Sequence, residues 1–440
     1  MEEYDANKYI GTTDTMRFDG IDIHELAKKI KEPFYLMSEN QLEYNYKSFI
    51  KAFSGIKDFK VYFSVKTNFE SEVLKKLKQM DAGMEIAGKL GLECVRRAKI
   101  EPDKIIVDGP VKSDFILNEA ISKKFHCINI ESMEESKRVN EISKKQGVIT
   151  SIGVRIDPLV DKNYYDALID TYKRKFGIPI TEAKEKIIEA SKLSNLKIER
   201  LHAHIGSQLI NTKFHVNSLK KLMKLASELK NEGIEIKEIN IGGGYPAVNM
   251  RSIRIARRLK ISSILEKIGM FEMKNPSIHE FGKDITEAYN EKSKEYGIKP
   301  SISSEPGRFL VSNIGMLVGE VILRKGKWAF TQISMNDIAE NIFFAERRME
   351  IANKINEPKT KRINLSGPTL CTADVMAINM KAPETEVGDT VVIFDVGAYS
   401  ISRSSQFTKP RIAAYYIKNG EVKLMRRAET PSNVLMTQEW

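Results

Sequence analysis

The sequence predicts an α/β protein, a (β/α)8 (TIM) barrel joined to a second, β-rich domain. Up to Arg308, eight short apolar runs alternate with amphipathic segments of helical spacing. After Arg308, strand-like runs dominate. Polar residues also gather where the expected strands end, which is where barrels of this kind place their chemistry. Eight regular repeats favour a closed barrel over the alternative, an open doubly wound sheet.

The barrel strands and helices are expected in strict alternation. The helical segments between the strands include ESEVLKKLKQM and NSLKKLMKLASELKNEG, and a first helix is expected to begin after Ser38 as its N-cap. These units make residues 39–308 the predicted barrel domain. The expected strands are KVYFSV near residue 61, GMEIA near 84, KIIVDG near 105, HCINIE near 127, TSIGVRID near 152, ERLHAHIG near 200, KEINIGGG near 238 and SISSEPG near 302.

The second domain is expected to combine both ends of the chain. Residues 309–440 contain the strand-like runs GMLVGEVI, KWAFTQISM, GDTVVIFDVG, RIAAYYIKNG and EVKLMRR, with a hairpin at KNGE between the last two. Residues 1–38 contain MRFDGID and FYLM, which we expect to join the same domain.

Composition and the chain start favour a cytoplasmic protein. No run approaches the roughly 18 apolar residues of a membrane span, so no membrane partner is expected. The start MEEYDANKY lacks the basic region and apolar core of a signal peptide. The three cysteines, Cys94, Cys127 and Cys371, have no CxxC spacing, so neither a disulfide framework nor a zinc site is indicated.

The formal net charge of +11 does not by itself indicate nucleic acid. Basic residues are spread along the chain among acids, and the densest patch, RSIRIARRLK at 251–260, is interpreted as a solvated helix face. Since no recognition motif accompanies the charge, no nucleic-acid partner is expected.

The polar residues at the strand ends are ordinary one by one. A glycine triplet is often a plain turn, and a strand-end arginine usually pairs with a local acid. A lone lysine just past a strand would normally point to water. The set at these strand ends is Lys66, Glu85, Arg155, His202, His204, Ser207, Gly242, Gly243, Gly244, Glu305 and Arg308.

Together these residues suggest one cofactor. A lysine in a partly dry site has a lowered pKa and can form a Schiff base, so Lys66 suits an aldehyde. The glycines of GGGYP would let backbone N–H groups approach a phosphate. The cofactor that carries both an aldehyde and a phosphate is pyridoxal 5′-phosphate. Glu305 would then pair with its pyridine nitrogen and keep it protonated.

Six motifs resemble one enzyme family over nearly the whole chain: VYFSVKTN, LHAHIGSQ, INIGGGYP, EPGRFLV, SGPTLCTADV and DVGAYS. In this order and spacing they are similar to the barrel-type (fold type III) pyridoxal-phosphate decarboxylases, the diaminopimelate and ornithine decarboxylase family. The layout is closest to the diaminopimelate enzymes. The resemblance implies an alanine racemase-like barrel and decarboxylation of an α-amino acid through a Schiff base on Lys66.

The resemblance also implies roles for individual residues. Cys371, which would protonate the α-carbon, would enter from the partner subunit together with Asp374, so a homodimer with shared active sites is implied. Thr372, Asp374 and Arg308 would face the substrate. The implied cofactor contacts are His204 stacked on the ring, Ser207 and Gly242 to Gly244 on the phosphate, Tyr399 and Arg308 near the phosphate, Arg155 beneath the cofactor, Glu85 beside it and Glu305 on the pyridine nitrogen.

Four departures from the family pattern concern the substrate. Where the family has a CES triplet, Thr372 and Ala373 follow Cys371, and an extra residue stands between Pro368 and Cys371. Gly91 replaces a usual glutamate. An RPxLY-like segment is replaced by one with Asn341, Phe343 and Phe344. These changes predict a different amino acid, less polar or carrier-linked, and the positive net charge would suit an acidic carrier protein.

Three alternatives remain open from the sequence. One is a racemase on the same barrel, and another is a catalytically silent, regulatory relative of the decarboxylases. The third is a metal hydrolase that uses His202 and His204, which point the same way on one strand. No metal is expected, because the remaining histidines lack ligand spacing: His24, His126, His215 and His279.

Overall fold

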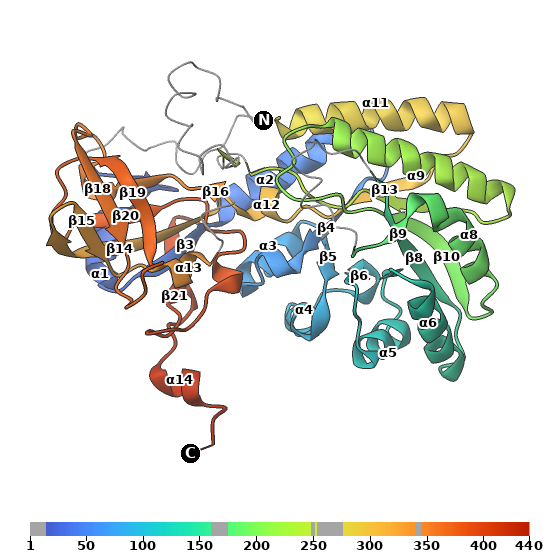
Figure 1. Ribbon diagram of the computed structural model, residues 1–440, viewed down its shortest axis with the longest axis horizontal. Helices are drawn as coiled ribbons and strands as arrows, with labels where there is room; N and C mark the ends of the chain where they lie inside the picture. The colour runs from blue at the N-terminus through green and yellow to red at the C-terminus, as the bar shows by residue number, and fades with distance from the viewer. Residues whose placement is uncertain (1–14, 160–174, 248–250, 253–275, 340–344, 440) are drawn as a thin grey trace.

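A computed structural model describes residues 15–159, 175–247, 251–252, 276–339 and 345–439. Eight parallel strands lie side by side in chain order, and β8 pairs with β10 to close the ring into a barrel (Figure 1). All eight expected strands are confirmed, as is the closed barrel. The strands are β4 (Lys60–Ser64), β5 (Gly83–Ile86), β6 (Ile105–Val107), β7 (Cys127–Ile130), β8 (Thr150–Asp157), β10 (Leu196–His202), β11 (Glu238–Asn240) and β13 (Ser301–Ser304).

Helices cover the outside of this barrel. The predicted cap is confirmed, because the Ser38 side chain accepts a hydrogen bond from the amide of Gln41 at the start of α2. A short strand, β9 (Ile178–Pro179), extends the sheet beside β8. The helices are α2 (Glu39–Ala52), α3 (Ser71–Gln79), α4 (Gly88–Arg97), α5 (Asp114–Ser122), α6 (Met133–Lys145), α8 (Ile180–Ser191), α9 (Lys213–Asn231), α11 (Ile278–Tyr296) and α12 (Arg308–Val311).

A second sheet forms the β-rich domain beside the barrel (Figure 1). Its strand β3 (Phe34–Ser38), the predicted FYLM strand, lies between β14 and β21, so the start of the chain contributes to this sheet. The expected KNGE hairpin is confirmed, since Lys418 pairs with Glu421. The other strands are β14 (Gly315–Lys325), β15 (Trp328–Thr331), β17 (Met349–Ile351), β18 (Lys361–Ser366), β19 (Val375–Ala382), β20 (Thr390–Ile393), β21 (Ala413–Lys418) and β22 (Glu421–Arg426).

Several small elements complete the fold. The strands β1 (Arg17–Phe18) and β2 (Ile21–Asp22) form a hairpin whose Phe18 packs with the β-rich domain. The strands β12 (Arg251–Ser252) and β16 (Ala345–Glu346) pair with each other. The remaining helices are α1 (Ile23–Ile30), α13 (Met335–Ile338) and α14 (Pro431–Leu435).

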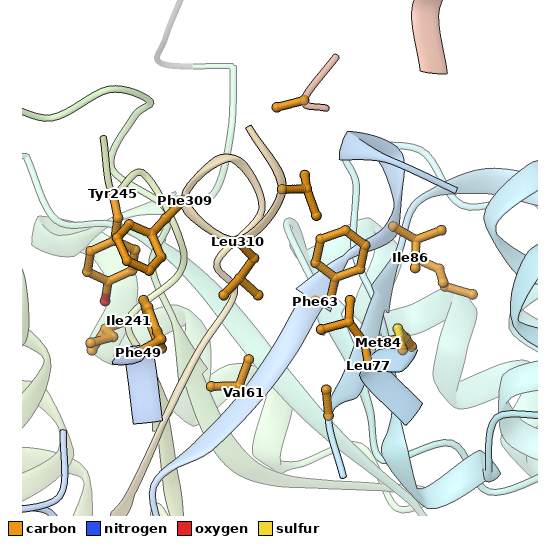
Figure 2. Close-up of a cluster of buried hydrophobic side chains, with 14 of the residues drawn as sticks. Phe49, Val61, Phe63, Leu77, Met84, Ile86, Ile241, Tyr245, Phe309 and Leu310 are labelled. Carbon is orange, nitrogen blue, oxygen red and sulfur yellow. The ribbon is translucent and has the colours of Figure 1, made fainter. Parts of the chain in front are cut away.

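In the hydrophobic core, side chains of the barrel strands pack against side chains of the surrounding helices, among them Phe49 of α2 and Leu77 of α3 (Figure 2). Tyr245, which follows the glycine triplet, packs edge-on against Phe49 of α2 with ring centroids 5.0 Å apart. Its hydroxyl lies 3.1 Å from the hydroxyl of Ser304. The glycine segment is therefore fixed from below by a buried aromatic side chain.

The two domains meet at the turn that follows β4. The Thr67 carbonyl accepts hydrogen bonds from the amide of Tyr399 (3.0 Å) and the hydroxyl of Ser402 (2.9 Å). The Asn68 side-chain amide donates to the carbonyl of Gly397 (2.8 Å). The β-rich domain thus holds the backbone on the C-terminal side of Lys66.

None of the helices in the described ranges is long and apolar enough to cross a membrane. Two sequence predictions fall largely or wholly outside the described residues. These are the basic patch at 251–260, of which only the backbone of β12 is described, and the substitutions Asn341, Phe343 and Phe344.

Candidate active site

Lys66 forms an ion pair with a buried acid of the next strand. Its Nζ lies 2.7 Å from Oε2 and 3.0 Å from Oε1 of Glu85, which is fully buried at the end of β5. The hydroxyl of Ser64 also donates to Glu85. The Lys66 side chain nevertheless remains 51% exposed, so a ligand from solvent can reach the ammonium while Glu85 holds it in place.

The lowered pKa expected for Lys66 is wrong. Desolvation is the largest influence and favours the neutral amine, but the charge and hydrogen bond of Glu85, together with smaller effects of neighbouring groups, raise the pKa of Lys66 above its ordinary value. Lys66 therefore rests as an ammonium, and Glu85 is the group next to it that can accept a proton.

A second cluster of buried polar groups, Asp108, His202 and Glu305, lies at the ends of β6, β10 and β13. His202 Nε2 is 3.3 Å from Glu305 Oε2, and His202 Nδ1 is 3.7 Å from Asp108 Oδ1. The side chains of both acids are further held by amides, since Asn129 donates to Asp108 (2.7 Å) and Asn240 donates to Glu305 (2.8 Å).

The two acids of this cluster titrate in opposite directions. Burial, reinforced by the negative charge of Asp108, raises the pKa of Glu305 to about 7. Asp108 is also desolvated, but the charges of His202 and Arg155 outweigh this and lower its pKa to about 2. Burial disfavours a charged His202, yet the two carboxylates together raise its pKa.

The structure does not bring His202 and His204 together as a metal site. Within the described residues, Asp108, His202 and Glu305 are the one group whose ligand-type atoms lie close enough, within 4.8 Å, to surround a cation. His202 faces each acid with a different ring nitrogen, which makes it a bridge between two carboxylates. His204 is outside this group.

His204 instead contacts the glycine segment. The amide of Gly243 donates to its Nδ1 at 3.2 Å, so the ring proton of the neutral imidazole lies on Nε2. Desolvation and the charges of Arg155 and Lys66 hold the pKa of His204 well below its ordinary value. The ring is therefore neutral, and His204, like Lys66, is exposed.

The three glycines are required by close approach of neighbouring backbone. An added Cβ would lie 2.4 Å from the carbonyl of Ala203 at Gly242, 2.4 Å from that of Glu305 at Gly243 and 2.6 Å from that of Gly206 at Gly244. The amide of Gly242 is bonded to Asn240 (2.8 Å) and that of Gly243 to His204. Within the described residues the amide of Gly244 makes no hydrogen bond and can bind an anion.

Arg155 is held by an acid that the sequence analysis did not single out. Its Nη1 donates to Oε1 of the buried Glu131 at 2.8 Å, and its guanidinium lies 4.7 Å from the centre of the Phe176 ring. The other oxygen of Glu131 accepts the amide of Gly177 (3.0 Å). This pairing fixes the guanidinium beside the end of β8, and its position beneath the cofactor stays a prediction.

Arg308 and Tyr399 come together from the two domains. The Arg308 guanidinium lies over the Tyr399 ring, 4.8 Å from its centre. Tyr399 has a left-handed backbone (φ 57°), and its amide donates to the carbonyl of Thr67, the residue after Lys66, which places it near the lysine. Ser207 is exposed in the loop between β10 and α9.

The turn between β18 and β19 carries the predicted substrate residues, which differ in their exposure to solvent. Cys371 and Thr372 are exposed, and neither side chain makes a hydrogen bond or ion pair within the described residues. Asp374 is only 3% exposed, and its carboxylate accepts the amide of Met335 (2.8 Å) and the amide of Thr369 (3.0 Å). The expected role of Asp374 as a substrate contact is therefore corrected, because its oxygens hold the turn.

The residues present fit a cofactor that combines an aldehyde, a phosphate and a pyridine nitrogen. Lys66 supplies a reachable amine, the Gly242 to Gly244 segment supplies an unpaired amide in a space too tight for side chains, and Glu305 supplies a buried carboxylate. A parallel barrel with these groups at one end defines the class of barrel-type pyridoxal-phosphate enzymes.

Comparison with known proteins identifies the family. The family model described as pyridoxal-dependent decarboxylase, pyridoxal binding domain, matches residues 39–312. The chain belongs to this pyridoxal-dependent decarboxylase family, binds pyridoxal 5′-phosphate and is a carboxy-lyase.

Its relatives include diaminopimelate decarboxylases from distant organisms. The enzyme from Aquifex aeolicus is 29% identical over 98% of this chain and 96% of its own length. That from Methanocaldococcus jannaschii is 28% identical over 95% of this chain and 93% of its own. The crystal structure of the M. jannaschii enzyme superimposes with a TM-score of 0.86, at 26% identity, and covers 99% and 98% of the two chains.

Two residues of the site, Asp108 and Glu131, escaped the sequence analysis. Each follows an expected strand directly, in KIIVDG and HCINIE. Their position at the C-terminal end of a barrel strand was the available signal. Acids are so frequent in loops that this signal is weak without the strand neighbours that the fold supplies.

Proposed function

We propose that this enzyme removes the α-carboxylate of an amino acid, with Lys66 as the amine that binds the cofactor aldehyde. One observation carries the proposal. The ammonium of Lys66 is held against a fully buried carboxylate, that of Glu85, yet the lysine side chain stays 51% exposed. Burying a carboxylate is costly, so a lysine on an ordinary protein surface is not expected to pair with a fully buried acid.

Each surrounding residue has a task in this proposal. Glu85 takes the Lys66 proton when the amine becomes a nucleophile. Gly244 and Ser207 bind the phosphate, Arg308 binds phosphate or a substrate carboxylate, and Arg155 lies beneath the cofactor. When bound, the cofactor supplies the electron sink for the pair left by CO2. Glu305 accepts the pyridine N–H, and neutral His204 can stack on the ring without adding a second positive charge.

The substrate is proposed to differ from that of the diaminopimelate enzymes. At Thr372 a hydroxyl replaces the acid that the resemblance leads one to expect, which removes a charge-assisted contact of about 1.5–3 kcal/mol. At Gly91 an added Cβ would lie only 3.1 Å from the Ile86 Cβ. Glutamate would therefore crowd α4 at this position. A less polar or carrier-linked amino acid, with an acidic carrier suited to the positive net charge, fits these changes.

The working unit is proposed to be a homodimer. Residues 39–308 would form the cofactor-binding barrel, and residues 1–38 with 309–440 would complete the partner's site. Support comes from the exposed Cys371 and Thr372, whose side chains have no bonding partner within the described part of their own chain. Cys371 would protonate the α-carbon left after CO2 departs.

The test is release of CO2 from the full chain loaded with pyridoxal phosphate. The substrates are diaminopimelate, both enantiomers of lysine, ornithine, arginine, glutamate and carboxynorspermidine. Lys66→Ala should lower release from the active substrate by at least about 10³-fold, the scale of losing a central proton-transfer group. Lys76→Ala, which removes another ion-paired lysine, should leave it unchanged. Unaltered release by Lys66→Ala would refute the assignment.

The same assay separates the alternatives. Racemisation of an amino acid without CO2 release would favour the racemase, and cofactor binding without either reaction would favour the regulatory relative. A mixture of Lys66→Ala and Cys371→Ala chains should regain about a quarter of the wild-type activity if two subunits share each site, because half of the random dimers carry one intact site. No recovery would contradict shared sites.

A further inference from the structure

In the buried cluster of Asp108, His202 and Glu305, the neighbouring amides fix which atoms donate hydrogen bonds and which accept them. The Asn240 Oδ1 accepts the amide of Gly242 (2.8 Å), so its Nδ2 must be the atom that donates to Glu305. The Asn129 Oδ1 faces the thiol of Cys127 (3.2 Å), so its Nδ2 donates to Asp108. Both carboxylates are therefore held as acceptors from their outer sides.

His202 lies between these two acceptors. It faces Glu305 at 3.3 Å with Nε2 and Asp108 at 3.7 Å with Nδ1, and its side chain is only 1% exposed. Neither ring nitrogen makes a hydrogen bond of regular geometry, but each faces a carboxylate at ion-pair distance, which favours the imidazolium form. A buried charge of this kind is maintained only when it is paired, and here two acids pair with it.

We propose that His202, anchored by Asp108, is a positioning residue that orients Glu305 for the pyridine nitrogen of the cofactor and favours its ionised form there. The inference rests on the proposed role of Glu305. Without the cation, Glu305 would face Asp108 and Glu85 alone and would hold its proton more tightly, because like charges oppose its ionisation. A protonated Glu305 can no longer balance the charge of a protonated pyridine.

Other charges that face the cluster do not replace His202. Arg155 and Lys66 act on Asp108, but Arg155 is paired with Glu131 and Lys66 with Glu85. The amides of Asn129 and Asn240 carry no charge. Among the described groups that face Glu305, His202 is thus the cation in direct contact with it.

The inference is tested with two cofactors of the same shape. Pyridoxal 5′-phosphate and its 1-deaza analogue, which has carbon in place of the pyridine nitrogen, are titrated into the full chain and the ratio of their dissociation constants is measured. Loss of a structural residue weakens both cofactors alike, whereas loss of His202 should weaken only the nitrogen cofactor. In His202→Gln the preference for the nitrogen cofactor should fall about tenfold, the scale of one charge-assisted hydrogen bond.

The matched control is His126→Gln. His126 also pairs with a buried glutamate, its Nε2 2.9 Å from Oε2 of Glu238, at the opposite end of the same barrel. This variant should keep the wild-type ratio. An equal fall in His126→Gln would assign the effect to general loosening of the barrel and overturn the inference. His202→Asn serves as a second variant if His202→Gln does not fold.

The variant Glu305→Gln distinguishes the proposed role of Glu305 at the cofactor nitrogen from the proposed role of His202 in positioning Glu305. A lowered ratio in Glu305→Gln with an unchanged ratio in His202→Gln would overturn the inference and leave the role of Glu305 standing. Unchanged ratios in both variants would overturn the role of Glu305 itself, and the inference with it. Lowered ratios in both, with wild-type behaviour in His126→Gln, are the expected result.

Discussion

The described part of the barrel contains two pairs in which a histidine contacts a buried glutamate, one at each end, and their environments are opposite. At the end where the strands begin, His126 contacts Glu238, which is also approached by Arg200 (3.5 Å) and the hydroxyl of Ser303 (2.5 Å). At the end where the strands finish, His202 contacts Glu305 with Asp108 on its other side. The first glutamate is surrounded by donors and cations, whereas the second shares its cation with another acid.

The pKa values follow from these neighbours. Glu238 is desolvated, but its bonds to His126 and Ser303 and the charge of Arg200 lower its pKa to about 2. Burial and Asp108 raise that of Glu305 to about 7. At one end the negative charge of the glutamate is balanced by its neighbours, and the pair stabilises the fold. At the other end the two acids carry more negative charge than the nearby cation can balance. An end that is short of positive charge is suited to a cationic ligand group, such as a protonated pyridine.

The largest expected effect concerns the stability of the cofactor-free protein. Glu238→Gln should lower the free energy of unfolding by about 4 kcal/mol, because it leaves Arg200 without its buried counterion and His126 and Ser303 without their carboxylate partner. Glu305→Gln should lower it by less than about 1 kcal/mol, because relief of repulsion from Asp108 and Glu85 offsets the lost contact with His202. Urea denaturation at neutral pH measures both values. Equal losses would show that the two ends do not differ.

The arrangement of the barrel was predictable because its signals are local. Each strand is a short apolar run followed by a helical pattern, and all eight runs became strands in chain order. The strand-end position of Lys66, Glu85, His204 and Glu305 follows directly from that order. Parallel strands bring their C-terminal ends to one edge, so residues far apart in the chain converge without further information.

What the sequence could not supply was the set of neighbours around each group. A lowered pKa was expected for Lys66 from burial alone, but the sign depends on Glu85, whose distance is fixed by strand register. Asp374 resembled a substrate ligand by its place in CTAD, yet its carboxylate is taken up by the amides of Met335 and Thr369. Contacts of this kind depend on tertiary packing, which no local pattern encodes.

The stability effects of two glycine substitutions provide a second comparison of the two ends of the barrel. Gly243→Ala should lower the free energy of unfolding by about 3 kcal/mol, since its Cβ would lie 2.4 Å from the Glu305 carbonyl and force two strand ends apart. Gly297→Ala, at the end of α11, has open space and only a left-handed backbone (φ 63°), so about 1 kcal/mol is expected. Thermal unfolding measures both, and cofactor retention should fall only in Gly243→Ala. Loss of cofactor in both would contradict the comparison.

The smallest expected effect is a pH dependence of opposite sign at the two ends. The pKa of Glu305 is raised from an ordinary 4.5 to about 7, so between these values the folded state holds a proton that the unfolded state has lost. Its ionisation therefore costs stability as the pH rises, by about 2 kcal/mol from pH 5 to pH 7 in the cofactor-free protein. The pKa of Glu238 is lowered instead, so its contribution to stability is complete above pH 4.5 and is lost only as the pH falls towards 2.

The difference in unfolding free energy between wild type and Glu305→Gln should thus change across pH 5 to 7, while the difference for Glu238→Gln stays constant. A constant difference for both variants would mean that Glu305 is ionised throughout this range, and the surplus of negative charge at the cofactor end would have to be smaller than its neighbours indicate.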